Sequence, residues 1–125
     1  MTTPKRKIGA VFLVEDETMI RMMVAEMLED LGYTVTAEAS DIDEAVKLAE
    51  SARFDVAILD VNVNGKVVTP VAKTIEARRL PFVFVTGYGV QGIPEEFRSR
   101  PALQKPFQMD MLAGMIEKAI GSAAA

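Results

Sequence analysis

Short, continuous apolar runs constrain the fold of this chain more than any other feature. Three of them span 9–14, 54–59 (apolar after Asp55) and 82–85, and all lack the polar–apolar alternation of a strand with one solvent face. Strands buried on both faces are typical of parallel sheets. Between the runs, apolar residues recur at three- and four-residue spacings, as from Ile20 to Leu31, which predicts amphipathic helices.

The alternation of strands and helices predicts an α/β domain with a five-stranded parallel sheet. Right-handed crossovers would place helices on both faces of the sheet. The most economical arrangement is a flavodoxin-like, doubly wound sheet with strand order 2-1-3-4-5. The expected strands are 9–14, 34–39, 54–59, 82–85 and 102–104, and the last helix is expected at 109–120.

The length of 125 residues fits one domain, since half of the residues are hydrophobic and can form a core. We expect an extension at 1–8, a domain at 9–121 and a tail at 122–125. No apolar stretch approaches the length of a membrane span, and the first run is too short for a signal peptide. These observations predict a cytoplasmic protein without membrane contact.

The sequence contains no cysteine and no histidine, which excludes disulfides, thiolate chemistry and histidine acid–base catalysis. Any histidine in its reaction must therefore come from a partner. The net charge of −4 argues against nucleic acid as a direct ligand.

Polar side chains follow the ends of four predicted strands. Because the carboxyl ends of parallel strands meet at one edge of a sheet, these side chains should converge. The carboxylates would bind a hard divalent cation, Mg²⁺ or another such as Mn²⁺, with the Asn62 backbone carbonyl as a further ligand. The residues are Glu15 and Asp16 after the first strand, Asp60 after the third, Thr86 after the fourth and Lys105 after the fifth.

This set of groups suits the formation of an acyl phosphate on Asp60. Attack by a carboxylate on a phosphoryl group needs neutralisation of the phosphoryl oxygens rather than proton transfer. A metal would cover one oxygen, the Lys105 ammonium a second and the Thr86 hydroxyl the third. Singly, each residue has an ordinary explanation as a turn former, helix cap or solvated side chain, but the ordered set favours a site.

These residues resemble those of response-regulator receiver domains, the CheY-like proteins. The resemblance covers nearly the whole chain. The resemblance implies phosphorylation by a histidine kinase and a cis bond between Lys105 and Pro106. It also implies a metal-binding pair at Glu15 and Asp16, a phosphoacceptor and metal ligand at Asp60, a carbonyl ligand at Asn62, a switch hydroxyl at Thr86 and a phosphate-contacting lysine at Lys105.

A narrower resemblance lies in the segment 81–89, PFVFVTGYG, which is similar to the motif of the "FAT GUY" receivers. Val85 stands where that motif carries alanine. The segment 60–65 also fits this subclass, whose members are commonly stand-alone. The resemblance implies a single-domain response regulator with a histidine kinase of the HWE type as its donor. A histidine phosphotransfer protein or a downstream regulatory protein would be a further partner.

Two positions depart from the usual receiver pattern. Ala102 stands where most receivers carry an aromatic residue, and Asn64-Gly65 replaces a proline four residues after the phosphoacceptor. The second departure predicts a differently shaped or looser loop. We expect the glycine-rich loop 86–93, with Thr86 and Tyr88, to act as the switch by becoming ordered on phosphorylation. Alternatively, the glycines only form a tight turn and Tyr88 is a surface ring.

The first predicted helix carries an unusual number of methionines. Met23 and Met27 fall on its apolar stripe and are expected in the core. Met19, Met22 and Arg21 are candidates for contact with a kinase, although Arg21 has an ordinary explanation as a solvated side chain. The expected output surface lies around 94–120.

The sequence therefore favours a stand-alone phosphoacceptor in a two-component or phosphorelay pathway. It would signal by binding another protein or act as a phosphate sink, and it would not be an enzyme beyond catalysing its own Mg²⁺-dependent phosphorylation and dephosphorylation. The alternative is a receiver-like binding module that works without phosphorylation, although its acidic groups would then repel one another to no purpose. A phosphohydrolase is disfavoured because Asn62 stands where such enzymes typically carry a second aspartate.

Overall fold

A five-stranded parallel sheet forms the centre of the computed structural model, which describes residues 9–87 and 89–124. The spatial order is β2-β1-β3-β6-β7, and all neighbouring strands are parallel. Counting only the strands of this sheet, the predicted order 2-1-3-4-5 is confirmed. The strands are β1 (Ala10–Val14), β2 (Thr34–Ala39), β3 (Val56–Asp60), β6 (Phe82–Thr86) and β7 (Ala102–Gln104).

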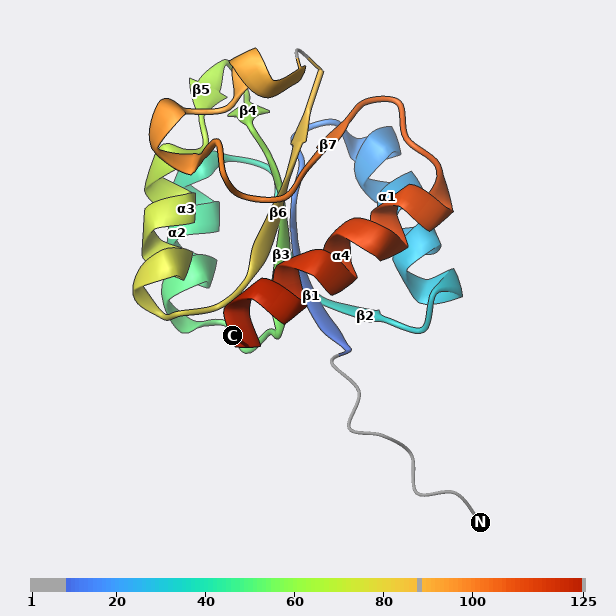
Figure 1. The fold of residues 1–125 in the computed structure, drawn as a ribbon. Coiled ribbons are helices and arrows are strands. Elements are labelled where there is room, and N and C mark those ends of the chain that lie inside the picture. Colours follow the sequence, from blue (N-terminus) through green and yellow to red (C-terminus); the bar gives the residue numbers. More distant parts are fainter. Residues whose placement is uncertain (1–8, 88, 125) are drawn as a thin grey trace.

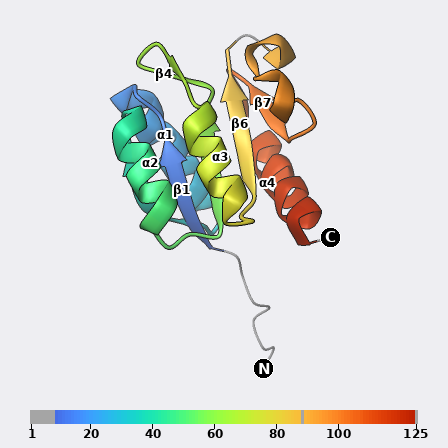
Figure 2. The same cartoon turned by 90° about the vertical axis from the view of Figure 1, so that its left-hand side faces the viewer.

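Helices cover both faces of the sheet (Figure 1; Figure 2). Helices α2 and α3 pack on one face, and α1 and α4 pack on the other. Two short 3-10 turns, Gly89–Gly92 and Glu95–Phe97, connect β6 to β7. The helices are α1 (Thr18–Asp30), α2 (Ile42–Ser51), α3 (Thr69–Ala77) and α4 (Met109–Ala124).

The strand side chains alternate between two apolar layers. Phe12, Leu59 and Phe84 belong to the layer under α2 and α3. Leu13 and Ile58 belong to the layer under α1 and α4. Because both faces are covered, the central strands need no polar positions, which explains their continuous apolar runs.

Local sequence signals set the start of α2. The Asp41 carboxylate accepts the Glu44 backbone N–H at 2.8 Å, the bond typical of a helix N-cap. The Glu44 carboxylate in turn accepts the Ser40 backbone N–H at 3.2 Å, a variant of the capping box. These two bonds stabilise the turn that follows β2, beside the candidate site.

Two helix predictions are wrong in detail. Helix α4 continues through Gly121 and Ser122 to Ala124, past the expected end at Ile120, because the alanines after Ser122 have the highest helix propensity. Met23 is 52 % exposed rather than in the core, because α1 turns Val24 and Leu28 inward and leaves Met23 at the rim of its apolar face.

A short hairpin follows β3 and was not predicted. Its turn residues, Asn64 and Gly65, have φ values of +52° and +78°, as in a type I′ turn. The alternative of a looser loop is wrong, because the segment forms an ordered hairpin. A shape that differs from that of most receivers stays a prediction. The two strands are β4 (Asn62–Val63) and β5 (Lys66–Val67), which pair antiparallel.

In the part of the chain that the structure describes, no helix is long and apolar enough to cross a membrane. The expected extension at 1–8 and the switch residue Tyr88 lie outside the described residues. The segment 94–100 contains only a 3-10 turn, in keeping with its charged sequence.

Removal of the Phe84 ring should strongly destabilise the fold. Phe84 is fully buried, and its ring centroid lies 5.3 Å from that of Phe82 and 5.6 Å from that of Phe97. We expect Phe84→Ala to lower the free energy of unfolding by about 3–5 kcal/mol in urea titrations followed by circular dichroism. Met19→Ala, at a side chain that is 84 % exposed, should change it by less than about 0.5 kcal/mol. Equal effects would contradict the assignment of this layer as core.

Candidate functional site

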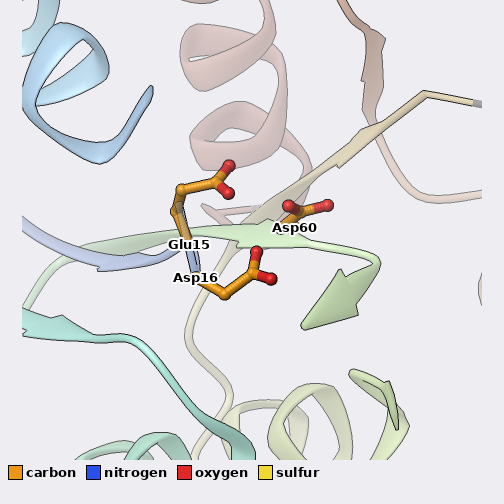
Figure 3. Close-up of side chains that lie close together, drawn as sticks. All are labelled: Glu15, Asp16 and Asp60. Atoms are coloured by element: carbon orange, nitrogen blue, oxygen red, sulfur yellow. The ribbon is translucent and has the colours of Figure 1, made fainter. Parts of the chain in front are cut away.

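Three carboxylates lie together at the carboxyl-terminal edge of the sheet (Figure 3). Glu15 and Asp16 directly follow β1, and Asp60 is the last residue of β3. One oxygen from each of these side chains lies within 4.8 Å of the other two. The predicted convergence of the acidic residues is therefore confirmed.

Strand pairing places these residues side by side. Val14 is paired with Leu59, so the residue that follows each of them reaches the same edge of the sheet. Asp60 is also paired with Val85 of β6, and Val61 donates its backbone N–H to the Val85 carbonyl at 2.9 Å. Asp60 therefore sits between β1 and β6 near the middle of the sheet.

Lys105 joins two of the carboxylates. Its Nζ lies 3.1 Å from Glu15 Oε1 and 3.0 Å from Asp60 Oδ2. Partial burial lowers the pKa of Lys105, but hydrogen bonds with Asp60 and Glu15 and the charges of these acids raise it by more. The pKa of Lys105 therefore lies above its ordinary value. The side chain is therefore an ammonium at neutral pH. The peptide bond between Lys105 and Pro106 is cis, as the receiver resemblance implied.

Glu15 is the most perturbed acid of the cluster. Burial raises its pKa most, and the Asp60 charge adds to this effect, giving a pKa of about 7. Hydrogen bonds from the Glu17 backbone N–H at 3.1 Å and from Lys105 act in the opposite direction but are weaker. Glu15 is therefore partly protonated near neutral pH, which reduces the repulsion within the cluster.

Asp16 differs from its neighbour because it is more exposed. Burial raises its pKa, but a hydrogen bond from the Asn64 backbone N–H at 3.0 Å and one with the Glu15 side chain outweigh this effect. The pKa of Asp16 is lowered as a result. Asp16 is thus the acid of the pair that stays ionised.

A cleft beside the cluster contains the remaining predicted residues. Thr86 ends β6 and is buried, and the Lys105 backbone N–H donates to its carbonyl at 2.8 Å. Asn62 lines the same cleft, and its backbone N–H lies 3.4 Å from Asp60 Oδ1. The metal-ligand role of the Asn62 carbonyl stays a prediction. The lining residues are Asp16, Glu17, Asp60, Val61, Asn62, Val67, Thr86, Gly87, Gly92 and Lys105.

Sequence reasoning missed the contact that Arg21 makes with the cluster. Its guanidinium donates to the Glu15 backbone carbonyl at 3.0 Å and pairs with the Glu38 carboxylate at 3.1 Å. Arg21 is only 19 % exposed, so the interpretation as a freely solvated side chain is wrong. Its position one turn into α1, after an acidic loop, is the signal that could have indicated this contact.

The donor set suits a hard divalent cation. The three clustered side chains offer only oxygen atoms, which Mg²⁺ prefers, and Mg²⁺ keeps several waters in its octahedral shell. A cation would also relieve the repulsion among the carboxylates. The residues present therefore fit a magnesium site.

Comparison with known proteins assigns the family. Residues 11–117 match the response regulator receiver domain family. The chain belongs to this family. Its members are phosphorylated by histidine kinases and bind Mg²⁺ at an acidic pocket, and the cluster of Glu15, Asp16 and Asp60 corresponds to such a pocket.

Individual relatives agree with this assignment. The transcriptional regulatory protein PdtaR of Mycobacterium tuberculosis is 38% identical over 114 residues, which cover 88% of this chain and 56% of PdtaR. The chain thus spans about half the length of that relative. The solution structure of SdrG from Sphingomonas melonis has a TM-score of 0.78 and 39% identity, covering 94% of this chain and 98% of SdrG.

A third relative contains a metal ion. It is the receiver domain of a sensor histidine kinase from Pseudomonas aeruginosa, with a TM-score of 0.76 and 28% identity. The match covers 90% of this chain and 98% of that domain. A magnesium ion is coordinated in the active-site cleft of that structure.

The raised pKa of Glu15 should make the stability of the chelator-treated protein depend on pH. In the unfolded chain Glu15 titrates near 4.5, and in the folded protein near 7. Its contribution is therefore fully present below pH 4.5 and is lost as the pH rises through 7. We expect urea titrations in EDTA to show wild-type stability falling across this interval relative to Glu15→Gln.

The shifts of Asp16 and Lys105 act outside this interval. The lowered pKa of Asp16 acts below its ordinary value of 3.8, and the raised pKa of Lys105 acts above 10.5. Parallel stability curves for the wild type and Glu15→Gln between pH 4.5 and 7 would contradict the assignment of Glu15 as the protonated acid.

Proposed function

We propose that this receiver accepts a phosphoryl group from a histidine kinase onto Asp60 in a two-component or phosphorelay pathway. The observation that carries the proposal is the 3.0 Å contact between Lys105 Nζ and Asp60 Oδ2 within the acidic cluster. In the reaction, an Asp60 oxygen forms a bond to phosphorus while the bond from phosphorus to the kinase histidine nitrogen breaks. Attack by a carboxylate requires neutralisation of the phosphoryl oxygens rather than transfer of a proton.

Each residue of the cleft has a proposed part in this transfer. Lys105 leaves the Asp60 carboxylate to pair with the incoming phosphoryl oxygens, and the Thr86 hydroxyl donates to another of them. Glu15, Asp16, Asp60 and the Asn62 carbonyl would hold a divalent cation. A bound Mg²⁺ supplies charge neutralisation for the phosphoryl group. The chain catalyses only its own phosphorylation and dephosphorylation and is not an enzyme toward other substrates.

The surface of α1 supports docking of a kinase beside this site. Met19, Met22 and Met23 are exposed at 84%, 63% and 52%. Next to them, an apolar groove lined by Met27 and Phe107, among others, leads to Asp60 and Lys105. Methionine side chains adapt readily to an apolar partner, so a helical surface of a kinase could bind here.

The proposal extends to the receiver subclass, the donor kinase and the downstream partner. The segment 81–89 supports membership of the FAT GUY subclass, and with it a donor kinase of the HWE type. The phosphorylated form would signal by binding a histidine phosphotransfer or downstream regulatory protein, or would drain phosphoryl groups from the kinase. A cytoplasmic location and a stand-alone arrangement stay predictions.

Substitution of Asp60 tests the proposal directly. With Mg²⁺ and a radiolabelled phosphodonor, Asp60→Asn should abolish labelling because an amide replaces the carboxylate that attacks the phosphoryl group. Asp43→Asn, on the exposed face of α2, should label normally as a matched control. Labelling of Asp60→Asn would exclude Asp60 as the nucleophile. Absence of labelling in the wild type, with intact partner binding, would favour the phosphorylation-independent module.

The loop after β6 is expected to respond to the phosphoryl group. We propose that Thr86 moves toward the modified Asp60 and orders residues 87–92. Amide relaxation measurements should then show internal motion of smaller amplitude across this segment after addition of beryllofluoride. The same mobility with and without beryllofluoride would contradict a switching role for the loop.

A further inference from the structure

The β4–β5 hairpin lies beyond the edge of the sheet that carries the acidic cluster (Figure 1). We propose that this hairpin is a positioning element that fixes the Asp16 carboxylate for metal binding through the backbone N–H of Asn64. The inference deepens the proposed function and rests on the metal site, but not on the transfer of a phosphoryl group.

The contact that carries the inference joins residues far apart in the sequence. The Asn64 N–H donates to Asp16 Oδ2 at 3.0 Å across a separation of 48 residues. A hydrogen bond to a carboxylate is charge-assisted and directional, so it restrains the rotation of the side chain. A carboxylate has about four lone-pair positions on its two oxygens, so the bond to Oδ2 still leaves Asp16 able to bind a cation.

The hairpin is itself held firmly on both sides. Val63 of β4 and Val68, which directly follows β5, are fully buried in the layer under α2 and α3. The Val68 N–H donates to the Val61 carbonyl at 2.8 Å and closes the base of the hairpin. At the tip, the Asn64 side-chain amide donates to the Ser40 carbonyl at 3.1 Å. The tip is therefore tied to the segments that follow both β1 and β2.

The identity of the turn residues determines where this N–H points. Asn64 and Gly65 have φ values of +52° and +78°, which asparagine and glycine adopt more readily than other residues. A β-branched residue at position 64 opposes such a conformation and should displace the N–H from Asp16. Groups that orient metal ligands in this way commonly change metal affinity by about 10–100-fold when they are altered.

Two substitutions at Asn64 separate the backbone contact from the side-chain contact. Asn64→Gly and Asn64→Val both lose the bond to Ser40, but only valine opposes the positive φ. Isothermal titration with Mg²⁺ should show affinity reduced by about tenfold or more in Asn64→Val. Asn64→Gly should stay within about threefold of the wild type, because its N–H remains in place. Lys66→Ala, on the same hairpin and exposed, is the control and should bind Mg²⁺ as the wild type does.

A second measurement needs neither metal nor a turn variant. In protein treated with a chelator, nuclear magnetic resonance should show that Asp16→Ala shifts the Asn64 amide proton and accelerates its exchange with solvent. This readout decides the question if Asn64→Val fails to fold. The inference is overturned if folded Asn64→Val binds Mg²⁺ as tightly as Asn64→Gly, or if the Asn64 amide is unchanged in Asp16→Ala.

Phosphorylation measured on the same variants separates the two proposals. One outcome is that Asn64→Val loses affinity for Mg²⁺ while the wild type is never labelled on Asp60. This outcome would support the hairpin inference and refute Asp60 as a phosphoacceptor. Normal labelling of the wild type with equal Mg²⁺ affinity in both Asn64 variants would refute the hairpin inference alone.

Discussion

Repulsion among clustered carboxylates is the constraint on which the rest of this site depends. Glu15, Asp16 and Asp60 each place an oxygen within 4.8 Å of the others, and Glu15 and Asp60 are buried. The fold balances this charge with the Lys105 ammonium, which contacts two of the acids, and with a Glu15 pKa of about 7. The sheet order matters because it brings the ends of β1, β3 and β7 to this one centre.

The strand order and the acidic cluster could be predicted because both follow from strand boundaries. A continuous apolar run marks a strand that is buried on both faces, and its last residue marks the edge of the sheet. Asp60 ends β3 and Glu15 follows β1, so their proximity needed no knowledge of side-chain packing. The capping of α2 by Asp41 is equally local, since donor and acceptor lie three residues apart.

The features that were missed depend on packing between distant segments. Asn64-Gly65 is a local sequence signal for a hairpin turn, but the contact of Asn64 with Asp16 depends on how the hairpin docks. The contact of Arg21 with the Glu15 carbonyl likewise follows from the angle at which α1 leaves the sheet. The exposure of Met23 shows that an apolar stripe on a helix is wider than the surface it buries.

The opposite edge of the sheet contains a smaller carboxylate arrangement with a practical consequence. Asp55, just before β3, accepts the backbone N–H groups of Gly9 and Ala10 at 3.2 and 2.9 Å. The chain thus enters the domain at the end of β1 remote from the acidic cluster. A fluorophore or surface tether attached ahead of residue 9 would leave the reaction edge accessible, so immobilised protein is suitable for measuring kinase encounter rates.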